Sequence, residues 1–87
     1  MKIKVNTELS IRKIDDEIFI YDRNKSLIHA FNETGVIFWE ALINEIPFQQ
    51  LSNQITEKYD VEPEDVANDL AVFLKELKSL GIVEDDV

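Results

Sequence analysis

His29 is the only histidine of the chain, and it stands between Leu27 and Phe31 in a mostly apolar segment. Acid–base or nucleophilic chemistry at a histidine needs a nucleophile or an orienting acid within hydrogen-bond reach. Neither stands near His29 in the sequence, so we interpret it as a packed or half-exposed strand residue. The serines lack a recognisable nucleophile setting, and the chain has no cysteine. The sequence therefore predicts a protein that is not an enzyme.

Two acidic runs, Asp15-Asp16-Glu17 and Glu84-Asp85-Asp86, are the segments that come nearest to a cation site. Both lack the ligand spacing and the glycine of an EF-hand loop, and without cysteine there is no thiolate zinc site. We interpret the first run as a solvated turn and the second as a frayed acidic end. With only two glycines, the chain has no Gly-rich phosphate loop. We expect neither a metal nor a cofactor.

The charge of the chain is unevenly distributed, and the net charge is −9 at pH 7. Residues 1–30 carry six basic and five acidic side chains, whereas residues 31–87 carry three basic and thirteen acidic ones. Proteins bind nucleic acids largely by neutralising phosphates with Lys and Arg, so the acidic half argues against a nucleic-acid partner. No segment approaches the roughly 20 apolar residues of a membrane span, and the N-terminus does not resemble a signal peptide. We expect a cytoplasmic protein that does not bind membranes.

The candidate residues must be positioned by a single domain over residues 1–87, for which we predict the α+β class. Apolar and polar residues alternate at the start of segment 8–14, and β-branched and aromatic residues fill 17–22 and 26–31. Short polar turns join these segments, which favours a three-stranded antiparallel meander over about residues 8–31. The middle segment is the central strand, which leaves the first and third segments at the two edges.

Three helices are predicted after the strands, over about residues 33–80, in a winged helix-turn-helix-like arrangement. Asn32 is typical of an N-cap, and Pro47 and Pro63 suit the first positions of the second and third helices. Gly81 is typical of the position that follows a helix C-terminus. The strongest apolar periodicity of the chain lies in the third helix and predicts its buried face: Val66, Leu70, Phe73, Leu77 and Leu80.

A set of motifs in a fixed order accompanies this pattern. The helix start Asn32-Glu33-Thr34-Gly35 is followed by Ile37, Trp39 and Leu42. Further along stand Tyr59-Asp60-Val61, Pro63-Glu64, Val66, Asp69-Leu70, Phe73-Leu74, Leu77 and Gly81-Ile82-Val83. In this order and spacing, over residues 8–83, the chain resembles the PqqD-like family, also called the RiPP recognition element. The resemblance implies three antiparallel strands followed by three helices.

The resemblance also implies a function. Such domains are peptide chaperones that bind the leader part of a ribosomally made precursor peptide and present it to a modifying enzyme. The enzyme partner would be a radical S-adenosylmethionine (SAM) enzyme or another peptide-modifying enzyme such as a leader peptidase. The pathway would be the biosynthesis of pyrroloquinoline quinone (PQQ) or of another peptide product. The domain itself would bind no metal or cofactor.

The implied site lies between the third strand and the third helix. An edge strand has free N–H and C=O groups that can accept a peptide as a further strand, and apolar pockets beside it select side chains. One flank of the helix should line this groove, either Ala67, Ala71 and Leu74 or Asp69, Val72 and Glu76. The residues expected at the peptide are Lys25, Ser26, Leu27, Ile28, His29 and Ala30 of the strand and Val66, Asp69, Leu70, Phe73, Leu74 and Leu77 of the helix.

Two other functions stay open from the sequence. The same helices could build a winged-helix regulator of transcription, although the acidic third helix argues against it. The chain could also be a general protein-interaction or dimerisation module. An edge strand that pairs with a peptide can pair with its own copy, so a homodimer is a further expectation.

Overall fold

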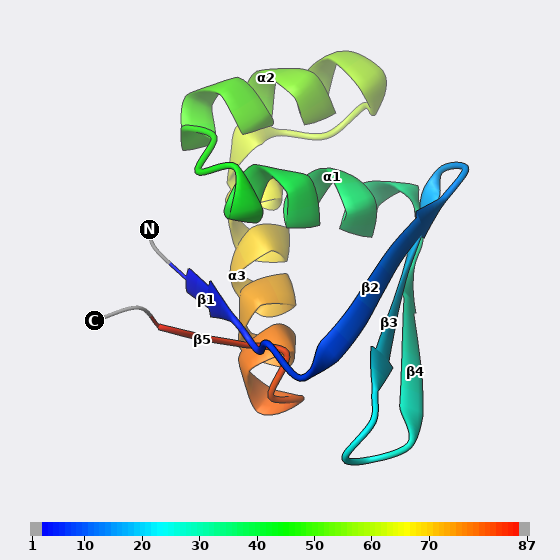
Figure 1. The fold of residues 1–87 in the computed structure, drawn as a ribbon. Helices are drawn as coiled ribbons and strands as arrows, with labels where there is room; N and C mark the ends of the chain where they lie inside the picture. Colours follow the sequence, from blue (N-terminus) through cyan, green and yellow to red (C-terminus); the bar gives the residue numbers. More distant parts are fainter. Residues whose placement is uncertain (1–2, 86–87) are drawn as a thin grey trace.

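The computed structural model describes residues 3–85, which form five strands and three helices (Figure 1). Three strands and three helices follow one another in the predicted order, with one further short strand at each end. The elements are β1 (Ile3–Val5), β2 (Leu9–Ile14), β3 (Glu17–Asp22), β4 (Leu27–Phe31), α1 (Glu33–Ile43), α2 (Phe48–Lys58), α3 (Pro63–Ser79) and β5 (Val83–Asp85).

The central part of the fold is an antiparallel sheet with the strand order β2-β3-β4. Its register places Ile20 of β3 opposite Ile11 on one side and His29 on the other. Ile18 and Ile20 are buried because they point toward the helices, whereas Tyr21 lies on the outer face and is exposed. The predicted α+β fold with a three-stranded meander is confirmed.

β4 begins one residue later than expected, at Leu27. Ser26 has a φ of 53°, in the left-handed region that belongs to turns, and so it ends the turn after β3. Asp22 holds this turn, because its buried carboxylate accepts hydrogen bonds from the backbone N–H groups of Asn24 and Lys25 at 3.1 and 3.2 Å.

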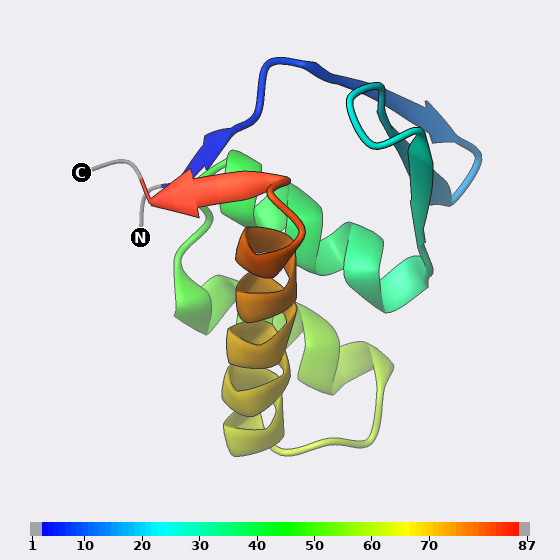
Figure 2. The ribbon, with the colours of Figure 1, turned by 90° about the horizontal axis from the view of Figure 1, so that it is seen from below.

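A second, two-stranded sheet of β1 and β5 was not expected from the sequence. It joins the two ends of the described chain and pairs Val5 with Val83 and Lys4 with Glu84 (Figure 2). The expected frayed acidic end is therefore wrong for Glu84 and Asp85, which lie in β5; Asp86 lies outside the described residues. Strands of three residues are too short to show an alternating pattern, so only the pairing itself reveals them.

The helix ends follow the expected local chemistry, except that Pro47 is the N-cap of α2 rather than its first residue, because its ψ of 144° is not helical and the helix begins at Phe48. The side-chain oxygen of Asn32 accepts a hydrogen bond from the Gly35 N–H at 3.0 Å, which fixes the start of α1 immediately after β4. α3 ends in a Schellman motif, with the Ile82 N–H bound to the Leu77 carbonyl at 3.0 Å. Gly81 supplies the positive φ of 74° that this motif requires. The chain can then turn back into β5.

The core lies between the three-stranded sheet and the helices. Trp39 of α1 is 2% exposed and packs with Ile18, Ile20 and Leu77 in the main apolar cluster. A second cluster joins α1, α2 and α3 around Phe38 and Leu51. Leu70 and Phe73 pack against both clusters, so α3 connects them.

The apolar stripe predicted along α3 is correct at its centre and wrong at one end. Val66 and Leu77 are fully buried, and Leu70 and Phe73 are half-buried. Leu80 is 38% exposed because α3 ends at Ser79 and the chain turns there. Leu74, which the predicted stripe did not include, is buried.

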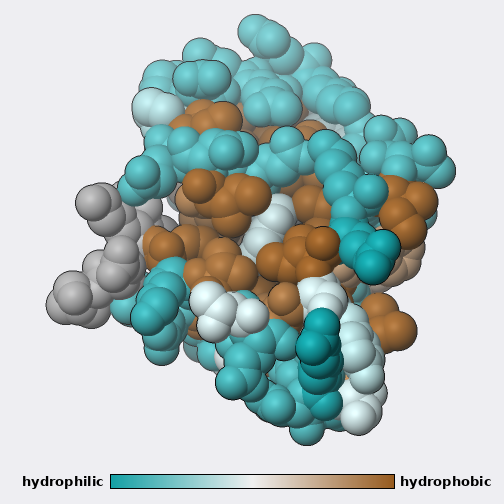
Figure 3. All heavy atoms as spheres, viewed as in Figure 1, coloured by the Kyte–Doolittle hydropathy of each residue, from teal (hydrophilic) through white to brown (hydrophobic). Residues whose placement is uncertain are grey.

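Part of the apolar surface remains outside the core. In the orientation of Figure 1, apolar side chains gather in the middle of the face, below α1 (Figure 3). Ile11 of β2 and Ile43 of α1 are among the large apolar side chains that stay exposed. Within residues 3–85, no helix has the length and apolar character needed to cross a membrane.

Candidate functional site

β4 is an edge strand. Among the described residues it pairs with β3 on one side, and its other side carries no strand. The strand is also apolar and exposed, with Leu27 at 47% and Ile28 at 69% exposure. Proteins normally protect such an edge with charge or proline, because its unpaired N–H and C=O groups are a template for another strand. β4 carries neither, so its geometry suits the addition of an extended peptide.

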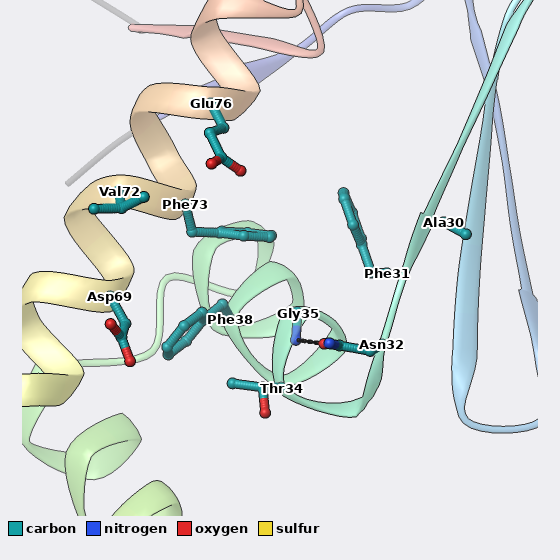
Figure 4. A pocket seen from close by; sticks show the side chains of 10 residues that line it. All are labelled: Ala30, Phe31, Asn32, Thr34, Gly35, Phe38, Asp69, Val72, Phe73 and Glu76. Atoms are coloured by element: carbon teal, nitrogen blue, oxygen red, sulfur yellow. Dashed lines mark hydrogen bonds between the residues drawn. The ribbon is translucent and has the colours of Figure 1, made fainter. Parts of the chain in front are cut away.

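A hollow of about 390 Å³ opens beside the end of β4. Its walls come from three elements: the end of β4, the first turns of α1, which the cap at Asn32 places directly after β4, and one side of α3 (Figure 4). The lining residues are Ala30, Phe31, Asn32, Thr34, Gly35, Phe38, Asp69, Val72, Phe73 and Glu76.

Three phenylalanines form the apolar part of this hollow. Phe31 of β4 meets Phe73 of α3 edge to face, with ring centroids 5.3 Å apart, and Phe73 also contacts Phe38 at 5.6 Å. Phe31 also packs against Trp39, and their ring centroids lie 5.7 Å apart. Because Trp39 is buried, this cluster is fixed to the core and offers a rigid apolar surface.

Gly35 allows α1 to begin so close to β4. A Cβ atom added there would lie 3.0 Å from the Cβ of Phe31, a tight contact that would require Phe31 to shift by a few tenths of an ångström. The small residue that the sequence places in the first turn of α1 therefore sets the distance between that helix and the aromatic ring of Phe31.

Two of the four polar side chains that line the hollow are acidic. Asp69 and Glu76 both come from α3, on either side of Phe73 (Figure 4). Within residues 3–85 neither carboxylate makes an ion pair or a side-chain hydrogen bond. The lining includes no lysine or arginine. The flank of α3 that faces the hollow is thus the one with Asp69, Val72 and Glu76.

The strand residues expected at the peptide lie at the edge of the sheet, apart from two. Leu27, Ile28, His29 and Ala30 belong to β4, whereas Lys25 and Ser26 belong to the preceding turn. Lys25 donates a hydrogen bond from Nζ to the carbonyl of Leu80 at 3.1 Å, at the C-terminal end of α3. The ammonium group of Lys25 therefore binds a carbonyl at the end of α3 that has no partner within the helix.

The helix residues expected at the peptide divide into two groups. Asp69 and Phe73 line the hollow, whereas half-buried Leu70 does not line it and packs against both apolar clusters. Val66, Leu74 and Leu77 are buried in the core and do not line the hollow, so the structure gives them the role of supporting α3.

The residues that α1 contributes to the hollow were not expected from the sequence. Asn32, Thr34, Gly35 and Phe38 form its floor and one end. A signal was nevertheless present, because an N-cap that directly follows a strand must place the first helical turn beside the end of that strand.

His29 lies on the inner face of β4, half-buried. Its Nε2 atom is buried and has no hydrogen-bond partner among the described residues. A base or nucleophile pair at this position is therefore not formed in the described part of the chain. Nor do residues 3–85 bring three or more His, Asp or Glu side chains together in a group that could hold a metal ion.

One ion pair stands beside the hollow, at the start of α1. Lys58, at the end of α2, pairs with Glu33. The hydrogen bond and charge of Lys58 hold the pKa of Glu33 below its ordinary value, and the same hydrogen bond raises the pKa of Lys58. The pair ties the N-terminus of α1 to α2, and both side chains remain in solvent.

Comparison with known proteins now identifies the family. Residues 17–83 match the family described as coenzyme PQQ synthesis protein D (PqqD). The chain belongs to the PqqD family. The match begins with β3 and ends at the first residue of β5, so it includes β4, α1 and α3, which form the hollow. It confirms the resemblance carried by the helix start at Asn32 and the motifs of α3. No curated protein sequence matches the chain.

Two solved structures share the fold of this PqqD-family chain. Lasso peptide synthetase B1 complexed with its leader peptide has a TM-score of 0.84 at 20% identity, and covers 97% of this chain and 99% of its own. TbiB1 in complex with the TbiA(beta) leader peptide has a TM-score of 0.77 at 23% identity, covering 97% of this chain and 95% of its own. Both similarities extend over nearly the whole chain, so they also include β1 and β5.

Proposed function

We propose that this chain binds the leader segment of a ribosomally made precursor peptide as a fourth strand on β4. The single observation that carries the proposal is the free, apolar edge of β4 beside a hollow lined by Phe31, Phe38 and Phe73. Membership of the PqqD family and the two leader-peptide complexes of the same fold support it.

The energetics require both the edge and the hollow. Pairing with the five residues of β4 forms about five hydrogen bonds, worth about 5 kcal/mol in total. Ordering a flexible peptide costs about 2–5 kcal/mol and offsets most of that gain. Two or three apolar side chains buried against the phenylalanines add about 1.5–3 kcal/mol each. Affinity in the micromolar range follows, with the backbone fixing register and the hollow selecting side chains.

The same geometry suits presentation to a modifying enzyme, which we propose as the second partner. A peptide strand on β4 occupies only the short groove between β4 and α3, so the rest of the precursor extends beyond the domain. The chain has no need of a catalytic group for this role. A radical SAM enzyme and a leader peptidase both remain consistent with it, since either would act on the part of the precursor beyond the bound leader.

The test uses a synthetic leader peptide from the short reading frame nearest to the gene for this chain. In an added antiparallel strand, only every second residue directs its N–H group toward β4. N-methylation of one alternating set of amides should therefore abolish binding, and N-methylation of the other set should leave it largely intact. If both sets bind equally well, strand addition is wrong. If a second copy of the chain occupies β4 and excludes the peptide, dimerisation is the better-supported function.

A further inference from the structure

The walls of the groove between β4 and α3 differ in charge. On α3, Asp69 and Glu76 both line the hollow. On the other wall, Leu27–Phe31 includes no lysine, arginine, aspartate or glutamate. Lys25, in the turn before β4, is hydrogen-bonded to the Leu80 carbonyl beyond the end of α3. The groove therefore presents two carboxylates that no cation of the described chain neutralises.

The two carboxylates flank the aromatic centre of the groove. Asp69 precedes Phe73 by four residues and Glu76 follows it by three, so all three share one face of α3. In Figure 4, Asp69 lies toward Thr34 and Phe38 at one end, and Glu76 lies at the other end beyond Phe73. At a rise of 1.5 Å per residue, the two acidic positions are about 10.5 Å apart along the helix.

An extended peptide on β4 can match this spacing. Side chains at every second position of a strand share one face, and positions four residues apart are separated by about 13 Å. A residue midway between them would stand opposite Phe31 and Phe73. Because Phe31 is the last residue of β4, the peptide then continues past the strand toward Asn32 and Thr34 at the Asp69 end. Lysine and arginine have long flexible stems, so their charged ends can close the small difference in spacing.

We infer that the groove selects peptides in which an apolar residue is flanked, two positions away on each side, by basic residues. This inference rests on the proposed function and names the chemistry of the peptide that it takes. The central residue packs on the Phe31–Phe73 pair, while the two basic side chains form charge-assisted hydrogen bonds with Asp69 and Glu76. The net charge of −9 adds a general attraction for a basic peptide.

The experiment compares three blocked peptides on one scaffold, Thr-Xaa-Thr-Leu-Thr-Xaa-Thr, in which Xaa is Lys, Gln or Glu. Dissociation constants are measured on the full chain by amide NMR titration at low ionic strength. Each exposed charge pair contributes a factor of about two to five, so the Lys peptide should bind about 4–25-fold more tightly than the Gln peptide. The Glu peptide should bind most weakly, and salt should reduce the differences.

Variants separate the groove from the overall charge. Asp69→Asn and Glu76→Gln should each reduce the preference for Lys over Gln by about two- to fivefold, and the double variant should remove it. The matched control is Glu57→Gln with Glu64→Gln, which removes two exposed charges that do not line the hollow. This control should keep the preference. Equal loss of preference in both double variants would overturn the inference, because the attraction would then be general.

The outcomes also distinguish the two proposals. If the Lys and Gln peptides bind the wild-type chain equally and shift the amides of β4, the charge preference is wrong and the groove remains a peptide site. If none of the three peptides shifts the amides of β4 or α3 while the spectrum stays folded, the proposed function fails, and the inference that rests on it fails too.

Discussion

Phe31 at the end of β4 and Phe73 in the middle of α3 meet edge to face, with ring centroids 5.3 Å apart and ring planes inclined by 65°. This contact joins the edge strand to the helix in the apolar part of the hollow. It makes the proposed peptide site a single rigid unit, because Phe31 also rests on buried Trp39. These aromatic side chains therefore contribute both to the proposed peptide binding and to the stability of the fold.

Phe73→Ala should weaken leader-peptide binding because it removes half of the aromatic pair at the centre of the hollow. We expect a loss of about 1–2 kcal/mol of binding free energy, or about five- to thirtyfold in Kd. Isothermal titration calorimetry with the leader peptide measures it. Phe48→Ala is the matched control, since Phe48 is 42% exposed at the start of α2 and does not line this hollow. If both variants bind equally well, the hollow is not where the peptide side chains lie.

Trp39→Ala should destabilise the fold rather than act on the peptide directly. Trp39 is 2% exposed and touches both the sheet and α3 through the main cluster. Removing a fully buried aromatic side chain costs about 3–5 kcal/mol of unfolding free energy. Urea denaturation followed by circular dichroism measures the change. A loss below about 1 kcal/mol would mean that the ring does not belong to the core.

Lys58→Gln should lower stability in a pH-dependent way. The carboxylate of Glu33 has a lowered pKa in the folded state, so its contribution is present above the ordinary value of 4.5 and is lost as the pH falls through the lowered pKa. The raised pKa of Lys58 makes its contribution complete below 10.5 and lost as the pH rises further. The thermal midpoint of the variant should thus fall below that of the wild type at neutral pH and converge with it in strong acid.

The control for that comparison is Lys75→Gln, because Lys75 is an exposed lysine without an ion pair in the described part of the chain. Its thermal midpoint should stay near that of the wild type at every pH. A difference between Lys58→Gln and the wild type that persists unchanged below about pH 3 would show that the pair with Glu33 is not the cause.

Gly81→Ala tests the end of α3. The φ of 74° at Gly81 is costly for any residue with a Cβ atom, by about 1–2 kcal/mol. We expect a loss of that size in the unfolding free energy, measured by denaturant titration. The Schellman motif also leads the chain into β5. In the variant, the amides of β1 and β5 should therefore exchange hydrogen faster than in the wild type, by a larger factor than the amides of β3. Unchanged stability and exchange would contradict this role of Gly81.

The sequence predicted those parts of the fold that have local signals. The meander was predictable because β-branched and aromatic residues fill β3 and polar turns surround it. The helix starts were predictable because Asn32 and Pro63 have the chemistry of first turns. The pairing of β1 with β5 was not, because three-residue strands at opposite ends of the chain have no local signature. Their pairing depends on the turn at Gly81, which brings Val83 beside Val5.

The candidate site was predictable on its strand side and only partly on its helix side. A period of 3.6 residues identifies the buried face of α3 but does not decide which flank faces β4. That choice depends on how α3 is rotated in the fold. The structure turns Asp69, Val72 and Glu76 toward the hollow and buries Leu74 on the opposite flank. Phe38 was missed because its ring belongs to the helix core and to the hollow at once.

The most direct test of the central claim is a two-dimensional amide NMR titration of the chain with the synthetic leader peptide. Strand addition predicts chemical-shift changes that concentrate on residues 27–31 of β4 and on Asp69, Val72, Phe73 and Glu76 of α3. The amides of α2 should stay in place and serve as the internal control. Shifts that fall elsewhere, or no shifts at saturating peptide with a folded spectrum, would contradict the claim that this groove captures a leader peptide.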